Sequence, residues 1–157
     1  MSALGHRPRK FLVVVDKTAE GPVALRFATR RAQHTSGRVT LLCVAEPGEF
    51  QQWRGVEEIM REEARQEAEG LIYAAAKTVN ELSGIMPELI IAEGRATECL
   101  LELLRSDRDI SILVLAAGTA KEGPGPLVSM FAGPGAHPIP VTIVPGGFSD
   151  EEIDALA

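Results

Sequence analysis

The sequence predicts an α/β protein with one doubly wound, Rossmann-like domain: a five-stranded parallel sheet flanked by helices. Its 157 residues are the length of a single domain. Short apolar runs alternate with helical stretches, the order typical of a parallel sheet with helices on both sides. The runs are continuous in Val, Ile and Leu, as expected of strands buried on both faces. We expect one domain over residues 1–157, with a core from about 10 to 146 between a short N-terminal tail and an acidic C-terminal tail.

The first strand and helix are the clearest elements in the sequence. Residues 11–15 (FLVVV) form an apolar, β-branched strand that ends at Asp16. A helix then opens at Pro22, because proline suits a first helical turn, and it ends near Gly37. Residues 38–44 (RVTLLCV) form the second strand.

The longest helix is predicted over about residues 56–82, after a loop that contains Trp53, the only tryptophan. Trp53 is interpreted as a loop anchor or contact residue. The leading segment of the helix (VEEIMREEARQEAEG) is so polar that we expect its first turns to be largely exposed. Its apolar positions repeat every 3.6 residues: Ile59, Ala64, Ala68, Leu71, Ile72, Ala75, Val79 and Leu82.

The second half of the chain repeats the alternation of strand and helix with shorter elements. Its predicted strands are 88–92 (ELIIA), 110–116 (ISILVLA) and 141–144 (VTIV), and its helices span about 96–105 and 127–132. A Gly- and Pro-rich loop over 117–126 separates the fourth strand from the last of these helices.

Charge and apolar content exclude several classes of protein. The net charge of −6, from 16 basic and 22 acidic residues, argues against a general binder of nucleic acid or anionic membranes. The apolar run at 11–15 is too short to span a bilayer and is not a secretory leader. Cys43 and Cys99 lie in apolar stretches without metal-type spacing, so we expect buried thiols in a reducing, cytoplasmic setting.

The residues typical of catalysis are dispersed along the chain. His6, His34 and His137 fall on a tail, a helix end and a Pro-flanked loop, and none stands beside a nucleophile or a second metal ligand. The sequence therefore predicts neither a catalytic triad nor a metal site, and we expect a protein that is not an enzyme.

A ligand site would lie where the carboxyl ends of the strands converge, near the switch point in strand order. Four segments meet there: 16–18, 45–47, 93–94 and 117–129. The carboxylate of Asp16, at the end of the first strand, could accept hydrogen bonds from ribose hydroxyls. It could equally serve as a turn or helix-cap residue, and the sequence leaves both readings open.

The loop AAGTAKEGPGPLVS, residues 116–129, is the second candidate for the site. Its glycines, Gly118, Gly123 and Gly125, stand with Lys121 before a helix start near Ser129. Exposed backbone N–H groups at such a helix start could cradle phosphates. The loop matches neither common phosphate-binding glycine motif, so a plain connection rich in turn residues remains the alternative.

In order and spacing, these segments resemble the universal stress protein family of UspA-like proteins. The matching segments are FLVVVD (11–16), PVALRFATRRA (22–32), TLLCVAEP (40–47), IIAEG (90–94), ISILVLAAG (110–118) and PVTIVPG (140–146). The resemblance implies an adenine-nucleotide α-hydrolase-like fold. It also implies that Asp16 and the backbone of Val44 would meet the ribose and adenine of a bound ATP or AMP.

The resemblance also predicts a degenerate ATP-binding motif. Members that bind ATP carry G-x-x-G, nine further residues, then G-[ST], after the fourth strand. Laid on that pattern, this chain has Ala116 and Thr119 at the first two glycines and Ser129 at the third. Sliding the register by two residues places Gly118 first but Lys121 second. Because side chains at glycine positions crowd the phosphates, tight ATP binding is not expected.

The resemblance implies a stress-response module that acts through dimerisation and protein partners. Family members commonly pair their last strands across a two-fold axis, and the corresponding residues here are Val141, Thr142, Ile143 and Val144. The alternatives are a switch that binds ATP or AMP and, less favoured, a slow nucleotide hydrolase.

Overall fold

The computed structural model describes residues 7–46, 54–135 and 137–157. Its strands are β1 (Lys10–Val14), β2 (Arg38–Ala45), β3 (Glu88–Glu93), β4 (Ile110–Ala117) and β5 (Val141–Pro145). Its helices are α1 (Gly21–His34), α2 (Arg54–Ser83), α3 (Ala96–Ser106), α4 (Pro126–Ala132) and α5 (Asp150–Leu156). Trp53 and most of its predicted loop lie outside the described residues.

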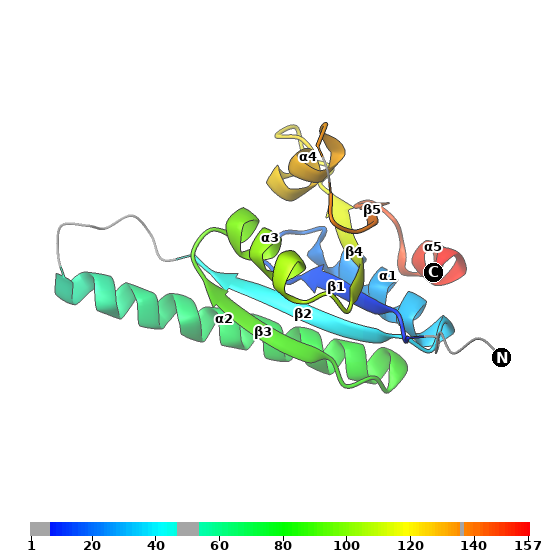
Figure 1. The fold of residues 1–157 in the computed structure, drawn as a ribbon, viewed down its shortest axis with the longest axis horizontal. Coiled ribbons are helices and arrows are strands. Elements are labelled where there is room, and N and C mark those ends of the chain that lie inside the picture. Colours follow the sequence, from blue (N-terminus) through cyan, green and yellow to red (C-terminus); the bar gives the residue numbers. More distant parts are fainter. Residues whose placement is uncertain (1–6, 47–53, 136) are drawn as a thin grey trace.

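The strands form one parallel sheet in the order β3-β2-β1-β4-β5 (Figure 1). The predicted fold class is therefore confirmed. Because β1 is central, the strand order reverses between β1 and β4, which makes their carboxyl ends the switch point.

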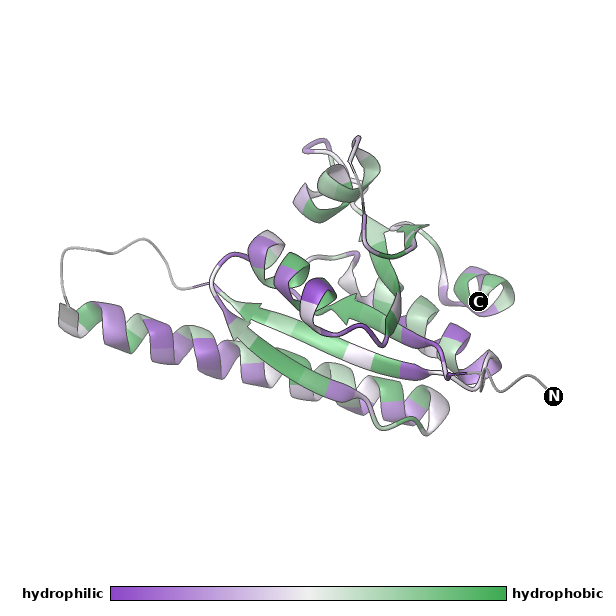
Figure 2. Cartoon of the chain, in the orientation of Figure 1, coloured by the Kyte–Doolittle hydropathy of each residue, from purple (hydrophilic) through white to green (hydrophobic). Residues whose placement is uncertain are grey.

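Two apolar layers enclose the sheet, and the strands between them are largely hydrophobic (Figure 2). One layer packs α1 and α2 on the sheet through Ala28, Ile72 and Val79, which are fully buried. The other packs α3 and α4 on the opposite face through Leu100, Leu104 and other side chains. The central strands are thus covered on both sides, as continuous apolar runs predict.

The edge strand β3 departs from that rule. Leu89 and Ile91 remain 37% and 36% exposed although they belong to an apolar run. One edge of β3 pairs with β2 and, within the described residues, no strand pairs with the other.

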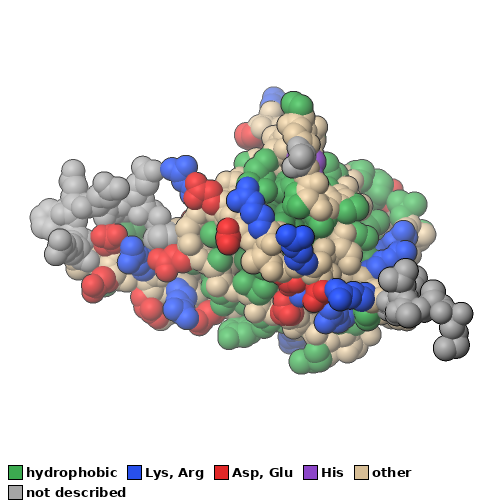
Figure 3. Space-filling view, in the orientation of Figure 1, with side chains coloured by type: hydrophobic (Ala, Val, Ile, Leu, Met, Phe, Trp, Pro, Cys, Tyr) green, Lys and Arg blue, Asp and Glu red, His purple; other side chains and the backbone are tan. Residues whose placement is uncertain are grey.

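Helix α2 extends beyond the sheet at its N-terminal end (Figure 1). Acidic and basic side chains alternate along this part of the surface (Figure 3), with i,i+4 pairs such as Arg61–Glu57 and Arg65–Glu69. Ile59 is 60% exposed, so the expected exposure of the first turns is confirmed. From Ala68 onward the same helix buries its apolar stripe.

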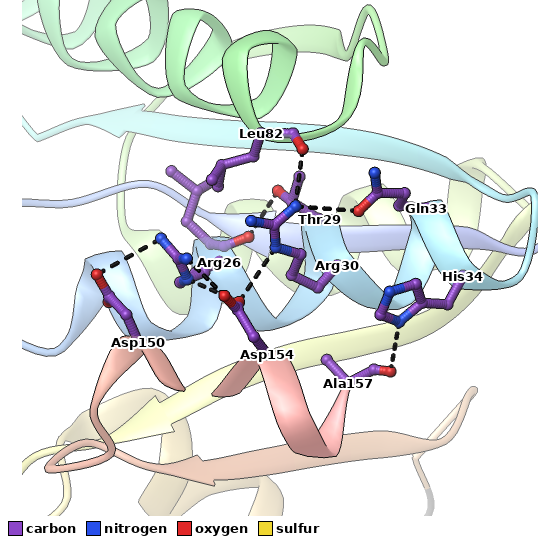
Figure 4. A network of polar contacts seen from close by, with 10 residues as sticks. Arg26, Thr29, Arg30, Gln33, His34, Leu82, Asp150, Asp154 and Ala157 are labelled. Atoms are coloured by element: carbon purple, nitrogen blue, oxygen red, sulfur yellow. Dashed lines mark hydrogen bonds and ion pairs between the residues drawn. The ribbon is translucent and has the colours of Figure 1, made fainter. Parts of the chain in front are cut away.

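The acidic C-terminal segment, expected as a tail, forms helix α5 and packs on α1 (Figure 4). Asp154 accepts hydrogen bonds from Arg26 Nε and Nη2, at 2.9 and 2.7 Å, and from Arg30 Nε at 3.1 Å. Ser149 and Glu152 cap the helix reciprocally, and Ile153 is 1% exposed. The hydrogen bond from Arg26 lowers the pKa of Asp154 to about 2.

The buried Lys10 joins the amino ends of β1 and β3 and the turn before β4 through two ion pairs. The ammonium group of Lys10, on β1, lies 2.5 Å from Asp107 Oδ2 and 3.2 Å from Glu88 Oε1. Burial lowers the pKa of Lys10, but the hydrogen bonds to Asp107 and Glu88 outweigh burial, and the pKa is raised above 10.5. The same bond, from Lys10, lowers the pKa of Asp107.

Candidate functional site

A cavity of about 270 Å³ lies at the carboxyl ends of β1, β2 and β4. The switch point between β1 and β4 forms its floor, and the first residues of α1, α3 and α4 surround it. This is the position at which open parallel sheets bind ligands.

The inner wall of the cavity is apolar. Val14 and Val15 come from the end of β1, Val44 from β2 and Leu115 from β4, and Val128 closes the wall from α4. Such a wall suits the flat apolar body of a small organic molecule.

The charged side chains at the rim of the cavity are all carboxylates: Asp16, Glu20 and Glu46. None of the described residues that line it is Lys or Arg. The nearby Lys17 forms an ion pair with Glu67 on α2 and lines the adjoining cavity instead. The charged rim thus favours ligands that donate hydrogen bonds and disfavours anions.

Asp16 follows β1 and is held in a local turn. Its Oδ1 accepts from the backbone N–H of Thr18 at 3.0 Å and from the Thr18 hydroxyl at 2.5 Å. The turn role left open by the sequence is therefore present, and Asp16 still lines the cavity. None of the hydrogen bonds that the structure describes at Asp16 uses Oδ2.

Glu46, just beyond β2, has a structural partner as well. Its Oε1 accepts from the backbone N–H of Ala96, the first residue of α3, at 2.8 Å. A carboxylate here satisfies an N–H group that the helix itself cannot use, and it complements the helix dipole. The N-terminus of α3 is thus already occupied by an anion of the protein.

Glu20 immediately precedes α1 and faces the loop after β4. A Cβ atom built on Gly118 would lie 3.2 Å from Glu20 Oε1, which places the carboxylate against this glycine. Among the described residues, no hydrogen bond or ion pair involves the Glu20 side chain, not even a cap of α1.

The loop after β4 uses some of its own N–H groups internally. Gly118 N donates to Pro124 O at 2.9 Å, and Gly123 N donates to Ala120 O at 3.1 Å. Gly123 and Gly125 have φ of 98° and 105°, in the region that glycine adopts without strain. Helix α4 begins with Pro126, which has no N–H. The loop is therefore a closed turn whose Gly118 and Gly123 N–H groups already have partners.

The predicted site residues divide into two groups in the structure. Asp16, Val44, Ala116 and Gly125 line the cavity together. Outside its lining lie Gly118, Lys121, Gly123 and Ser129, and Ser129 N donates to Gly125 O within the start of α4. The part that each plays in ligand binding stays a prediction.

Sequence reasoning did not select Glu20 as a site residue. A signal was present, since Glu20 stands directly before the Gly-Pro start of α1 and close after the strand end at Asp16. Its position against Gly118, on an element remote in sequence, has no local signature.

The described residues contain neither a cluster of metal ligands nor a helix that could span a membrane. Within residues 7–46, 54–135 and 137–157, no group of three or more His, Cys, Asp or Glu side chains could hold a metal ion. In the same part of the chain, no helix is long and apolar enough to cross a membrane.

Comparison with known proteins identifies the family. The sequence model of the universal stress protein family matches residues 8–127. No curated protein matches the chain significantly by sequence.

Solved structures share the fold at low sequence identity. The universal stress protein UspA from Lactobacillus plantarum is 18% identical with a TM-score of 0.76, over 89% of this chain and 99% of that one. The universal stress protein from Archaeoglobus fulgidus in complex with dAMP is 17% identical with a TM-score of 0.56, over 88% and 98%. A family member from Arabidopsis thaliana with AMP bound is 14% identical with a TM-score of 0.57, over 88% and 92%.

Proposed function

Because the chain belongs to the universal stress protein family, we propose that it is a non-catalytic stress-response module. It acts in the cytoplasm as a homodimer that binds protein partners, and its cavity is an altered nucleotide pocket that does not hold ATP tightly. In a reducing cytoplasm Cys43 stays a thiol, and its burial raises its pKa.

The observation that carries the dimer is the position of β5 at the edge of the sheet. One edge of β5 pairs with β4 and, within the described residues, the other has no strand partner. Ile143 on this strand is 38% exposed. An unpaired apolar edge favours strand addition, and a two-fold partner would cover it with an identical strand.

Sedimentation velocity at micromolar concentration tests the dimer. The native chain should sediment as a dimer, and Ile143→Glu, which places a charge at the interface, should shift it to monomer. Ile91→Glu on β3 is the matched control, because it puts the same charge on the opposite edge strand at 36% exposure. A native monomer, or dissociation by both variants alike, would remove the proposal.

A second candidate is a switch in which AMP or ATP occupies the cavity and alters the dimer or its partner surface. The cavity at the switch point, with Asp16 and Val44 on its wall, supports it. So does the presence of dAMP and AMP in two proteins with the same fold. The acidic rim and the replaced glycines of the family motif weigh against a triphosphate.

Calorimetric titration distinguishes the two candidates. ATP and AMP, with magnesium, are titrated into protein that is free of copurified nucleotide, and into Asp16→Ala. Absence of binding supports the module without a nucleotide. Micromolar binding that weakens in Asp16→Ala would make the switch the better description.

A further inference from the structure

Three carboxylates and no basic side chain line the described part of the cavity. We propose that the cavity is selective for an uncharged nucleoside over its phosphorylated forms, and that Glu20 is the residue that sets this selectivity. The inference rests on the altered nucleotide pocket of the proposed function and names its ligand class.

The three carboxylates differ in how far the protein neutralises them. Oδ1 of Asp16 accepts two hydrogen bonds from Thr18, and Oε1 of Glu46 accepts one from the N-terminus of α3. Glu20 receives no such bond from the residues that the structure describes. Hydrogen bonds from N–H and O–H donors disperse the charge of a carboxylate, so Glu20 presents the least compensated charge at the rim.

Glu20 also lies where it opposes a phosphate most directly. Its carboxylate is against Gly118, in the loop after β4 whose glycines and following helix start make it the candidate phosphate cradle. In this loop Gly118 N and Gly123 N already donate to loop carbonyls. A phosphoryl group would therefore meet a negative charge and would lose two of the donors that could offset it.

An uncharged nucleoside matches the same surroundings. Its base would contact the apolar wall that includes Val14, Val44 and Val128. Its ribose hydroxyls would donate to carboxylate oxygens, which only accept hydrogen bonds when ionised. Oδ2 of Asp16, Oε2 of Glu46 and both carboxylate oxygens of Glu20 accept no hydrogen bond among the described contacts. The ribose hydroxyls of a nucleotide could make the same bonds, but its fully ionised phosphate offers only acceptor oxygens, which would face the carboxylates without a hydrogen to share.

The test compares adenosine, AMP and ATP by calorimetric titration into the native chain and into Glu20→Gln, without magnesium. Adenosine should bind the native chain at least about tenfold more tightly than AMP, the discrimination expected of one close like-charge contact at the rim. Glu20→Gln should reduce the ratio of adenosine affinity to AMP affinity by about tenfold, chiefly because AMP binds more tightly to the variant. Added salt should lower the ratio of adenosine affinity to AMP affinity in the native chain. It should have little effect on that ratio in Glu20→Gln.

Glu122→Gln is the matched control, because it removes the same charge from an exposed residue of the loop outside the cavity lining. The ratio should be unchanged in this variant. Unfolding curves for both variants establish that they are folded.

Two results would overturn the inference, and they differ in what they leave standing. If AMP or ATP binds the native chain as tightly as adenosine, the selectivity is wrong but the nucleotide pocket remains. If none of the three compounds binds the native chain or Glu20→Gln, both the selectivity and the pocket are wrong. Dimerisation through β5 is measured independently by Ile143→Glu.

Discussion

Gly146 follows β5 directly and lies against the backbone of β4. A Cβ atom built on Gly146 would be 2.1 Å from the carbonyl oxygen of Ala117 and 3.0 Å from the Cβ of Glu20. An ordinary contact to Cβ is 3.4 Å or more, so alanine at this position would have to displace backbone by more than an ångström. Since backbone in a paired sheet cannot move freely, Gly146→Ala should strain the β4–β5 junction.

The expected cost follows from what overpacking costs in a well-packed interior, about 1–3 kcal/mol of unfolding free energy. We expect about 3 kcal/mol, because the closest atom is backbone and not a flexible side chain. For a chain of this size each kcal/mol lowers Tm by about 2–4 °C, so Tm should fall by about 6–12 °C. Urea unfolding followed by circular dichroism measures the free energy, and calorimetry measures Tm.

Gly70→Ala is the matched control for this substitution. Gly70 lies within α2, and a Cβ atom there would meet nothing within 4 Å. The same change should therefore stabilise the protein by about 0.5–1 kcal/mol, because alanine is the better helix former. If Gly146→Ala unfolds at the same urea concentration as the native chain, the close packing of the β4–β5 junction is refuted.

Three further predictions concern stability. The pKa of Asp154 is about 2, below its usual 3.8, so the α5 contact with Arg26 should stabilise the fold above pH 4 and be lost as pH falls from 4 to 2. Asp154→Asn should reduce the pH dependence of the urea-unfolding free energy between pH 4 and 2. The same pH dependence in the variant and the native chain would contradict the contact. Lys10→Met should cost about 2–4 kcal/mol in urea unfolding at pH 7, since it leaves Asp107 without its buried partner; a change within error would show that the pair is not coupled to folding. Leu100→Ala should cost about 2–5 kcal/mol, because the side chain is fully buried between α3 and the sheet; a cost below 1 kcal/mol would mean that this face is loosely packed.

Local sequence patterns predict the fold well where a strand is central. The run at 11–15 becomes β1, fully enclosed, because its neighbours and helices cover both faces. The run at 88–92 has the same character, yet β3 is an edge strand with Ile91 partly exposed. Strand order depends on contacts between distant segments, so an apolar run alone cannot show whether a strand lies at the centre or the edge.

The apolar pattern of a helix also does not show which of its residues are covered by other segments. Ile59 fits the 3.6-residue apolar repeat of α2, but it lies where the helix has passed the end of the sheet and is 60% exposed. The sequence predicts an acidic tail after Gly147 but leaves open whether this tail is ordered or free. The Ser149 and Glu152 spacing is a capping signal, and Ile153 supplies the one apolar side chain that α5 buries.

The candidate site could be predicted only in part, because it also depends on contacts between segments distant in the sequence. Asp16 follows from the sequence because strand ends are visible there and meet at one edge of a parallel sheet, whereas Val44 enters only through the family resemblance. Glu46 lies in segment 45–47, which the sequence places at the site, but the position of Glu20 against Gly118 needs the three-dimensional structure. Likewise, the internal hydrogen bonds of the loop at Gly118 cannot be read from its composition.

Hydrogen exchange at increasing protein concentration tests the central claim, dimerisation through β5, most directly. Backbone amides on the outer edge of residues 141–144 should exchange more slowly as the dimer forms, while those of β3 should not change. If β5 and β3 exchange at rates that are independent of concentration up to the millimolar range, the chain does not act as a β5-linked dimer.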